Sequence, residues 1–247
     1  MIKGLASSEA SMRPKMARLE VLANNLANIN STGFKRDRVF VELLKESAVA
    51  QAQGKGDLEG VKVTQYTDFS EGSLQQTGNP LDLALQGRGF FVVDTPRGQR
   101  YTRNGNFKLS TDGSLITSEG YSVQGDGGKI RFPDIRKLQE GKVAISDTGE
   151  ITLDREQMGH LRVVDFADLT RLQKDHQSFF MAEPGNIMME GPGNGTAVRQ
   201  GYLEESNVEG IEEMITMIEL NRNFETDQKV IQAQDATIDK SLEVGRL

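Results

Sequence analysis

The chain contains no cysteine and no tryptophan, and only two of its 247 residues are histidine. The absence of cysteine excludes disulfides, thiol chemistry and every metal site built on thiolates. Two histidines are too few for a histidine-rich metal site, so we expect neither a metal nor another cofactor. No run of about 18 apolar residues occurs, and the first residues lack the apolar segment and cleavage site of a signal peptide. We therefore expect no membrane insertion, and either a cytosolic location or export without a cleaved signal.

Glycine and proline are scarce at both ends of the chain and frequent in its middle. Of the 26 glycines, 22 lie between Gly54 and Gly201, and five of the six prolines fall in the same region. Long helices avoid both residue types, whereas turn-rich β structure uses them. The sequence therefore predicts an α+β protein with four parts: an N-terminal helical part (1–40), an extended linker (41–74), a central β domain (75–200) and a C-terminal helical part (201–247).

Apolar residues at the N-terminal end recur at spacings of three, four and seven, as in a heptad repeat. The residues with this spacing are Leu5, Met12, Met16, Leu19, Ala23 and Leu26. Pro14 removes one helical hydrogen bond, so we expect either a kink there or a short first segment followed by the main helix. Gly33 follows Thr32 and is expected to end this helix.

The C-terminal end shows a second apolar stripe of the same kind. Its members are Met214, Met217, Phe224, Ile231, Ile238 and Leu242. Ser206 or Asn207 is the expected N-cap of this helix, because acidic residues follow in the first turns. A helix over residues 211–242 would be roughly 48 Å long, and its narrow stripe requires another helix as partner. We expect the two terminal helices to pair as a coiled coil.

Three asparagines, Asn24, Asn25 and Asn28, lie where the first helical pattern ends. Asparagine is a poor helix former, because its amide competes for backbone groups. One interpretation is a frayed helix end that runs into a turn. The other is a buried polar ladder that fixes the register between packed helices.

Short apolar runs separated by turn residues fill the middle of the chain. Turn pairs such as Asp112-Gly113 recur every eight to twelve residues, which is the spacing of an all-β sandwich or barrel. The expected strands lie at 81–85, 89–94, 100–103, 114–118, 121–124, 129–132, 142–146, 150–153 and 160–166.

Charge is distributed unevenly around a net value of −7. Residues 1–40 hold seven Lys/Arg and three Asp/Glu, whereas residues 204–247 hold four Lys/Arg and eleven Asp/Glu. The two ends are therefore expected to attract each other, in one chain or between copies. Nucleic-acid binding fits poorly, because the basic end is small and the acidic end competes for it.

No catalytic motif stands out. Asp175 precedes His176, but sequence neighbours do not make a catalytic geometry, and no G-x-S-x-G motif occurs. The "GDGGK" segment (125–129) lacks the spacing of a phosphate-binding loop and is expected to be a hairpin turn. We therefore predict that the chain is not an enzyme. A self-contained β domain that binds a ligand remains as a function of a different class.

Four segments together resemble the bacterial flagellar rod and hook protein family. "NNLANINSTGFKR" (24–36) is similar to the N-terminal signature of this family, and "GNPLDLALQGRGFFVV" (78–93) to a motif of its central β domain. "YTRNGNFKLSTDGSLITSEGYSVQG" (101–125) resembles a second central motif, and the segment 201–235 the C-terminal helical region. The four matches occur in the order found in the family.

The resemblance implies a structural role without turnover. Family members are axial subunits that the flagellar type III apparatus exports without a cleaved signal, and they assemble helically with copies and other rod proteins to transmit torque. Their terminal helices pair as a coiled coil in the wall of the periplasmic rod. The positions that match the family's motifs, and are expected to serve assembly, are Asn24, Asn25, Leu26, Asn28, Thr32, Gly33, Phe34, Val208, Glu213, Met214, Ile218, Arg222, Phe224, Lys229 and Ile231.

The resemblance also favours one kind of family member. Residues 159–180 and 217–232 look more like the proximal rod protein than the distal one. The distal rod protein and a short hook-type protein remain as alternatives, although the modest length argues against a hook protein.

Overall fold

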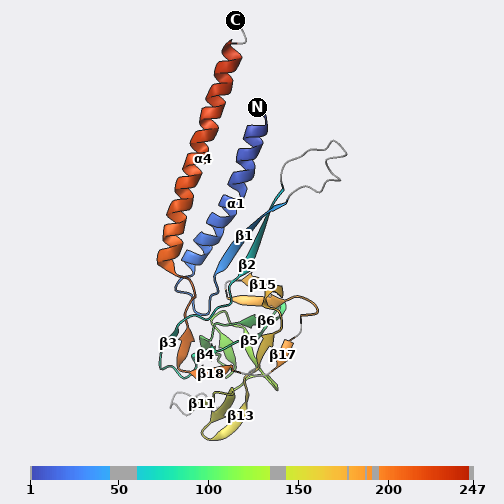
Figure 1. Ribbon diagram of the computed structural model, residues 1–247. Coiled ribbons are helices and arrows are strands. Elements are labelled where there is room, and N and C mark those ends of the chain that lie inside the picture. The colour runs from blue at the N-terminus through green and yellow to red at the C-terminus, as the bar shows by residue number, and fades with distance from the viewer. Residues whose placement is uncertain are drawn as a thin grey trace. The chain divides into compact units, whose positions relative to one another are not determined.

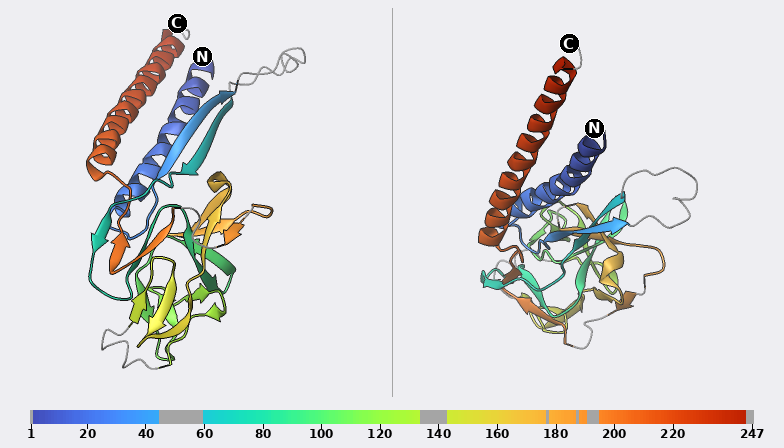
Figure 2. Two further views of the ribbon diagram at one scale, coloured as in Figure 1. Left: turned by 60° about the horizontal axis from the view of Figure 1, so that its bottom comes forward. Right: turned by 45° about the horizontal axis from the view of Figure 1, so that its top comes forward.

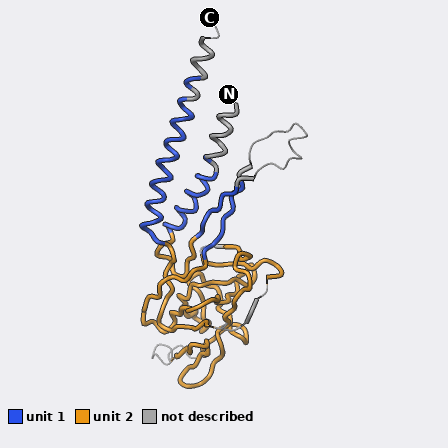
Figure 3. The backbone as a smooth tube through the Cα atoms, in the orientation of Figure 1, with its two compact units in different colours: residues 1–27, 37–68, 209–247 blue, residues 28–36, 69–208 orange. Residues whose placement is uncertain are grey.

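The computed structural model describes residues 2–44, 60–133, 143–176, 178–186, 188–190 and 195–244. It is an α+β structure in which, along the described chain, one long α-helix precedes and another follows a mostly β middle (Figure 1). The chain forms two compact units (Figure 3). The helical unit comprises Met1–Ala27, Asp37–Asp68 and Glu209–Leu247, and the β unit comprises Asn28–Arg36 and Phe69–Val208.

Two helices and one hairpin make up the helical unit. The helices are α1 (Ile2–Ala27) and α4 (Gly210–Val244), and the hairpin strands are β1 (Asp37–Leu44) and β2 (Gly60–Thr67). Helix α1 lies between α4 and the hairpin and contacts both of them (Figures 1 and 2). The side-chain rows of α1 and α4 therefore meet along one interface within this unit.

Helix α1 buries Val21, Leu22 and Asn25, which lie on one side of the helix because Asn25 is four residues from Val21 and three from Leu22. The helix continues through Pro14, so a separate first segment is not present. It ends at Ala27, and the expectation that Gly33 ends it is wrong. The backbone instead turns directly after the helix, where the Ser31 N–H donates to the carbonyl oxygen of Asn28.

One face of helix α4 lies toward α1, and its residues recur at spacings of four and three; we call this face the α1-facing seam. The buried and half-buried members of this seam are Glu213, Met217, Leu220, Phe224, Asp227 and Ile231. Lys15 of α1 forms an ion pair with Asp227 of this seam. Met214, which the sequence pattern placed in the same stripe, is instead exposed on another side of α4. The side chains of Ile238 and Leu242 lie outside the described residues.

The expected N-cap of α4 is also wrong, because the helix begins at Gly210. The Ser206 hydroxyl accepts a hydrogen bond from the Val208 N–H, and the Asn207 amide oxygen accepts one from the Arg36 N–H. Both side chains therefore hold the segment that precedes the helix and do not cap it.

The expected linker at residues 41–74 is a hairpin over most of its described part. Strands β1 and β2 pair antiparallel in continuous register from Asp37 opposite Thr67 to Leu44 opposite Gly60. Strand β2 holds two valines, two threonines and one tyrosine, and such residues favour strands. The sequence favoured a linker because residues 45–74 contain few large apolar side chains. Residues 45–59 lie outside the described residues.

The β unit consists of short strands and one 3-10 turn, η1 (Leu169–Arg171). The strands are β3 (Leu74–Gln76), β4 (Leu83–Gln86), β5 (Phe90–Thr95), β6 (Gly98–Thr102), β7 (Phe107–Leu109), β8 (Leu115–Thr117), β9 (Ser122–Gly125), β10 (Gly128–Lys129), β11 (Val143–Ile145), β12 (Glu150–Leu153), β13 (Glu156–His160), β14 (Val163–Phe166), β15 (Leu172–His176), β16 (Phe179–Ala182), β17 (Met188–Glu190), β18 (Ala197–Gln200) and β19 (Tyr202–Glu204). Each of the nine expected runs overlaps at least one of these strands, the run 129–132 only at Lys129.

The largest sheet has ten strands in the main order β15-β16-β6-β5-β9-β8-β7. Strands β14 and β17 join it through β5, and β10 joins it through β9. Strands β11, β12 and β13 form a separate three-stranded sheet, and β4 and β3 pair with β18 and β19, respectively. All of these strand pairs are antiparallel.

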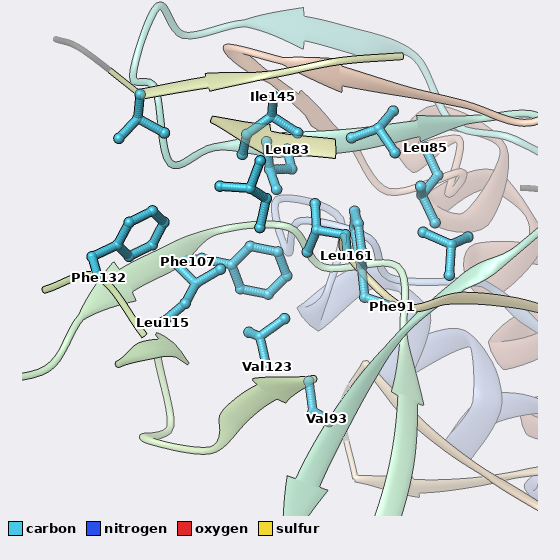
Figure 4. Close-up of a cluster of buried hydrophobic side chains, with 14 of the residues drawn as sticks. Leu83, Leu85, Phe91, Val93, Phe107, Leu115, Val123, Phe132, Ile145 and Leu161 are labelled. Carbon is cyan, nitrogen blue, oxygen red and sulfur yellow. The ribbon is translucent and has the colours of Figure 1, made fainter. Parts of the chain in front are cut away.

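Strand β5 lies in the core of the β unit. Phe91 and Val93 point into one apolar cluster with Leu83 and Phe107, which Figure 4 shows, whereas Phe90 on the same strand joins a second cluster. Successive residues of a strand point to opposite faces, so β5 is buried on both sides. This explains why "GFFVV" is a continuous apolar run and not an alternating one.

Candidate assembly site

The N-terminal family signature, residues 24–36, is divided between the two units. Residues 24–27 end α1 in the helical unit, and residues 28–36 belong to the β unit. The side chains of the signature therefore make separate sets of contacts in the two units.

Asn25 joins the end of α1 to the start of β1. Its side chain is 1% exposed, and its amide makes two hydrogen bonds of 2.9 Å with the backbone of Asp37, one to the N–H and one to the carbonyl. The Asp37 carboxylate in turn accepts a hydrogen bond of 2.7 Å from the Thr67 hydroxyl on β2. Asn24 is exposed, so the three asparagines form no buried ladder between helices. A single amide instead fixes the helix against the hairpin.

Gly33 and Phe34 fit closely into the β unit. Gly33 has φ +65°, and its N–H donates to the Glu204 carbonyl oxygen at 2.7 Å. A Cβ on Gly33 would lie 2.4 Å from the carbonyl carbon of Arg103, so only glycine fits here. Phe34 is fully buried, and the Lys174 ammonium lies 3.8 Å from the centre of its ring. These contacts hold the segment 28–36 on the β unit.

The next residue, Lys35, lies in a buried cluster of charges. Its Nζ atom donates to Glu204 Oε1 at 2.5 Å and to the Ser70 carbonyl oxygen at 2.6 Å. Arg103 Nη1 lies 3.3 Å from Glu204 Oε2, and Arg103 Nη2 donates to the Gly87 carbonyl at 2.7 Å. All three charged side chains are nearly inaccessible to solvent. The cluster therefore holds two cations and one anion away from water.

Burial lowers the pKa of the Lys35 ammonium below its ordinary value of 10.5, because the charged form loses its hydration. The attraction and hydrogen bond of Glu204 act in the opposite direction, and the charge of Arg103 adds to the lowering. Glu204 thus compensates only part of the cost of burying Lys35. The carboxylate of Glu204 is the group that keeps both cations in place.

Asn207 and Val208 are the last residues of the β unit, and both are fixed by contacts within it. The Asn207 amide oxygen accepts from the Arg36 N–H at 2.7 Å, and its Nδ2 donates to the Ser70 carbonyl at 3.1 Å. Val208 is buried. The segment that enters the β unit is therefore hydrogen-bonded to the segment that leaves it.

The remaining predicted residues differ in exposure. Leu26, Asn28, Thr32, Phe224 and Ile231 are half-buried, whereas Asn24, Met214, Ile218, Arg222 and Lys229 are exposed. Glu213 is buried in the α1-facing seam, and its Oε2 atom makes no hydrogen bond to a described residue. The predicted residues therefore form no single site.

Sequence reasoning missed the three side chains of the buried charge cluster: Lys35, Arg103 and Glu204. Each lies within a segment that carries the family resemblance, in "GFKR", "YTRNG" and "GYLEES". Their opposite charges gave no signal, because up to 169 residues separate them along the chain.

Two kinds of feature are absent from the residues that the structure describes: a metal-holding group and a membrane-spanning helix. No group of three or more histidine, aspartate or glutamate side chains is placed to hold a metal ion there. None of the described helices has the length and apolar character needed to cross a membrane.

Three family descriptions match the chain. They are "Flagella basal body rod protein" over residues 15–35, "Flagellar hook protein FlgE/F/G D1 domain" over 84–153 and "Flagellar basal body rod FlgEFG protein C-terminal" over 199–244. The flagellar basal-body rod protein FlgG of Bacillus subtilis is 32% identical to the chain across 100% of both sequences. The chain belongs to the flagellar basal-body rod protein family.

Other members of the rod family are similar over most of their length. FlgG of Agrobacterium fabrum is 31% identical, with 95% of this chain and 96% of the relative covered. FlgF of Caulobacter vibrioides is 31% identical, with 86% of this chain and 85% of the relative covered. This rod protein is thus a structural subunit of the flagellar basal body. FlgG and FlgF match it at nearly the same identity, so the identity does not distinguish between these two members.

Removal of the central carboxylate should destabilise this rod protein more than removal of either cation. We expect Glu204→Gln to lower the free energy of unfolding by about 3–5 kcal/mol, because two buried cations lose their partner. Lys35→Met should cost less, because Glu204 keeps Arg103. Urea unfolding followed by circular dichroism measures both. Asp147→Asn, which breaks an exposed pair with Arg199, is the control and should cost at most about 1 kcal/mol. Equal losses in all three variants would contradict the assignment.

The stability contributed by Lys35 should depend on pH. Its pKa in the folded chain is lower than the ordinary 10.5, so the unfolded chain binds this proton more tightly. The free energy of unfolding of the wild type, relative to Lys35→Met, should therefore rise as the pH rises toward 10.5 and level off above it. Urea titrations of both proteins at several alkaline pH values measure this difference. A difference that falls with pH would show that Lys35 is more strongly stabilised by Glu204 than it is penalised by burial.

Asn25 should matter far more than an exposed asparagine nearby. Asn25→Leu removes the two hydrogen bonds between this side chain and the Asp37 backbone, which should cost about 1–3 kcal/mol for each buried group that loses its bond. Hydrogen exchange at the Asp37 amide should become faster, because this bond closes the start of β1. Asn30→Ala, at an exposed position, should change the free energy of unfolding by no more than about 0.5 kcal/mol. Unchanged exchange at Asp37 in Asn25→Leu would refute the role of the amide.

Proposed function

We propose that this rod protein assembles helically with copies of itself and other rod proteins through its helical unit, and so transmits torque along the shaft. The observation that carries the proposal is the position of the exposed large apolar side chains. Ten of the twelve such residues in the described chain belong to the helical unit. Exposed apolar surface of this extent is typical of an interaction site and is costly in a protein that stays a monomer.

The helix pair supports the same proposal. The α1-facing seam of α4 has spacings of four and three, as a coiled coil requires. The ion pair between Lys15 and Asp227 joins a basic end of the chain to an acidic one. We propose that α1 and α4 continue as a coiled coil in the assembled rod, where neighbouring subunits cover the outer sides of both helices.

The proposal extends to location and export. A rod that crosses the cell envelope requires subunits in the periplasm, and we propose that the flagellar type III apparatus delivers them without a cleaved signal. The resemblance of residues 159–180 and 217–232 supports the proximal part of the rod as the position of this subunit. The distal part is the alternative, because the similar relatives include both FlgG and FlgF.

Loss of the protein should interrupt the shaft. We expect that a strain without its gene is non-motile and yields basal bodies whose rod is missing or short, as seen by electron microscopy. The full-length chain should restore both motility and the rod, whereas a chain that ends at residue 209, and so lacks α4, should restore neither. A complete rod in the deletion strain would refute the proposed function. The length of rod that remains distinguishes a proximal from a distal position.

A further inference from the structure

Two separate apolar patches lie on the helical unit. The α4 patch consists of Ile211, Met214, Ile215 and Ile218, whose side chains are 46–74% exposed. The hairpin patch consists of Phe40 on β1 and Tyr66 on β2, which are 59% and 47% exposed. Both patches contain large side chains of the kind that dominate protein interfaces.

The α4 patch is a continuous helical stripe. Its members lie three, four and seven residues apart, so they share one face. At 100° per residue this face lies roughly 150° around the helix from the seam that contacts α1. The patch therefore lies outside the interface with α1. It is a second apolar face of the same helix.

The hairpin patch also lies on one face. Phe40 is opposite Thr64, and Tyr66 is two residues further along the same strand, so the two aromatic side chains are diagonal neighbours. Val39 and the buried Asp37 alternate with Phe40 and point to the other face, and Asn25 of α1 binds the backbone of Asp37. Helix α1 thus covers one face of the hairpin and leaves the aromatic face open. A two-stranded hairpin is marginally stable without apolar cover.

The two patches of one chain cannot cover each other, because α1 lies between α4 and the hairpin (Figures 1 and 2). Each patch therefore requires a partner from another molecule. A helical assembly is built from a contact between two different surfaces that does not close into a ring. Every subunit must then carry two unlike and complementary patches, and the helical unit has two.

We propose that the α4 patch of one copy packs on the hairpin patch of a second copy in the rod. The inference rests on the proposed function and deepens it by naming the two surfaces that mate. Four aliphatic side chains would cover two aromatic rings, and the hairpin would lie between α1 of its own chain and α4 of its neighbour. The exposed charges add a modest attraction: Glu212 and Glu219 lie beside the α4 patch, and the aromatic face of the hairpin carries Arg38 and Lys62 against one acid, Glu42. Arg38 is also paired with Asp68 at 3.1 Å.

The absence of cysteine makes a direct test possible, because an introduced thiol has no native partner. Phe40→Cys and Ile215→Cys, each with its own tag, are expressed together in the bacterium that lacks the native gene. Isolated basal bodies are treated with a short bismaleimide, and the covalent dimer that carries both tags is measured. The matched control pair is Gln65→Cys with Asn223→Cys. Both control positions are exposed, but Gln65 points to the other face of the hairpin and Asn223 to another side of α4.

We expect at least about tenfold more dimer from the patch pair than from the control pair. Equal yields from the two pairs would overturn the proposal. In a second measurement, Phe40→Asp and Ile215→Asp should each abolish rod assembly while the purified chains keep the wild-type unfolding midpoint, because both side chains are exposed. Asn223→Asp should assemble normally.

The remaining outcomes separate this inference from the proposed function. Normal rods from both aspartate variants would overturn the pairing while the deletion strain still lacks its rod. Loss of assembly without the patch cross-link would mean that another rod subunit occupies these patches, and would also overturn the pairing. A complete rod in the deletion strain refutes the proposed function itself.

Discussion

The β unit depends on one buried carboxylate. Glu204 accepts hydrogen bonds from Lys35 Nζ and from the Gly72 N–H, lies 3.3 Å from Arg103, and accepts the Gly33 N–H at its own backbone carbonyl. Four segments that are distant in sequence therefore meet at one residue. A buried charge is tolerated only when its partners are in place, so an alternative register of any one segment would leave a charge unpaired. The cluster is thus better understood as a specification of the fold than as a source of stability.

The architecture could be predicted from the sequence where the signal is local. The glycine distribution separated the helical ends from the β middle, and the apolar run of β5 identified a strand that is buried on both faces. The hairpin of β1 and β2 was missed, because residues 45–74 hold few large apolar side chains and the pairing of Asp37 with Thr67 is not a local signal. The charge cluster was missed for a related reason. Lysine, arginine and glutamate are usually surface residues, and only the tertiary fold reveals that Lys35, Arg103 and Glu204 are buried together.

Helix α4 has two apolar faces, whereas the sequence pattern predicted a single apolar stripe. Met214 and Met217 are three residues apart, and both fit a seam with heptad spacing, yet Met217 is half-buried toward α1 and Met214 is exposed. A helix that is apolar on two sides can pack against two partners. The periodicity alone cannot divide the residues between these partners, because both faces repeat at the same interval. The two faces are distinguished by exposure, since Leu220 is buried toward α1 and Ile218 is exposed.

The positions that match the family signature serve two different requirements. Asn25, Gly33 and Phe34 make their contacts within this chain, so their resemblance to the family reflects how a subunit folds at the passage between its two units. Met214 and Ile218 match the family as well, but their side chains find no cover in the subunit itself. If the α4 patch packs on a second copy as proposed above, folding and assembly use separate sets of residues in the same motifs. The buried set would then keep the subunit folded before assembly, and the exposed set would be stabilised only after a neighbour has bound.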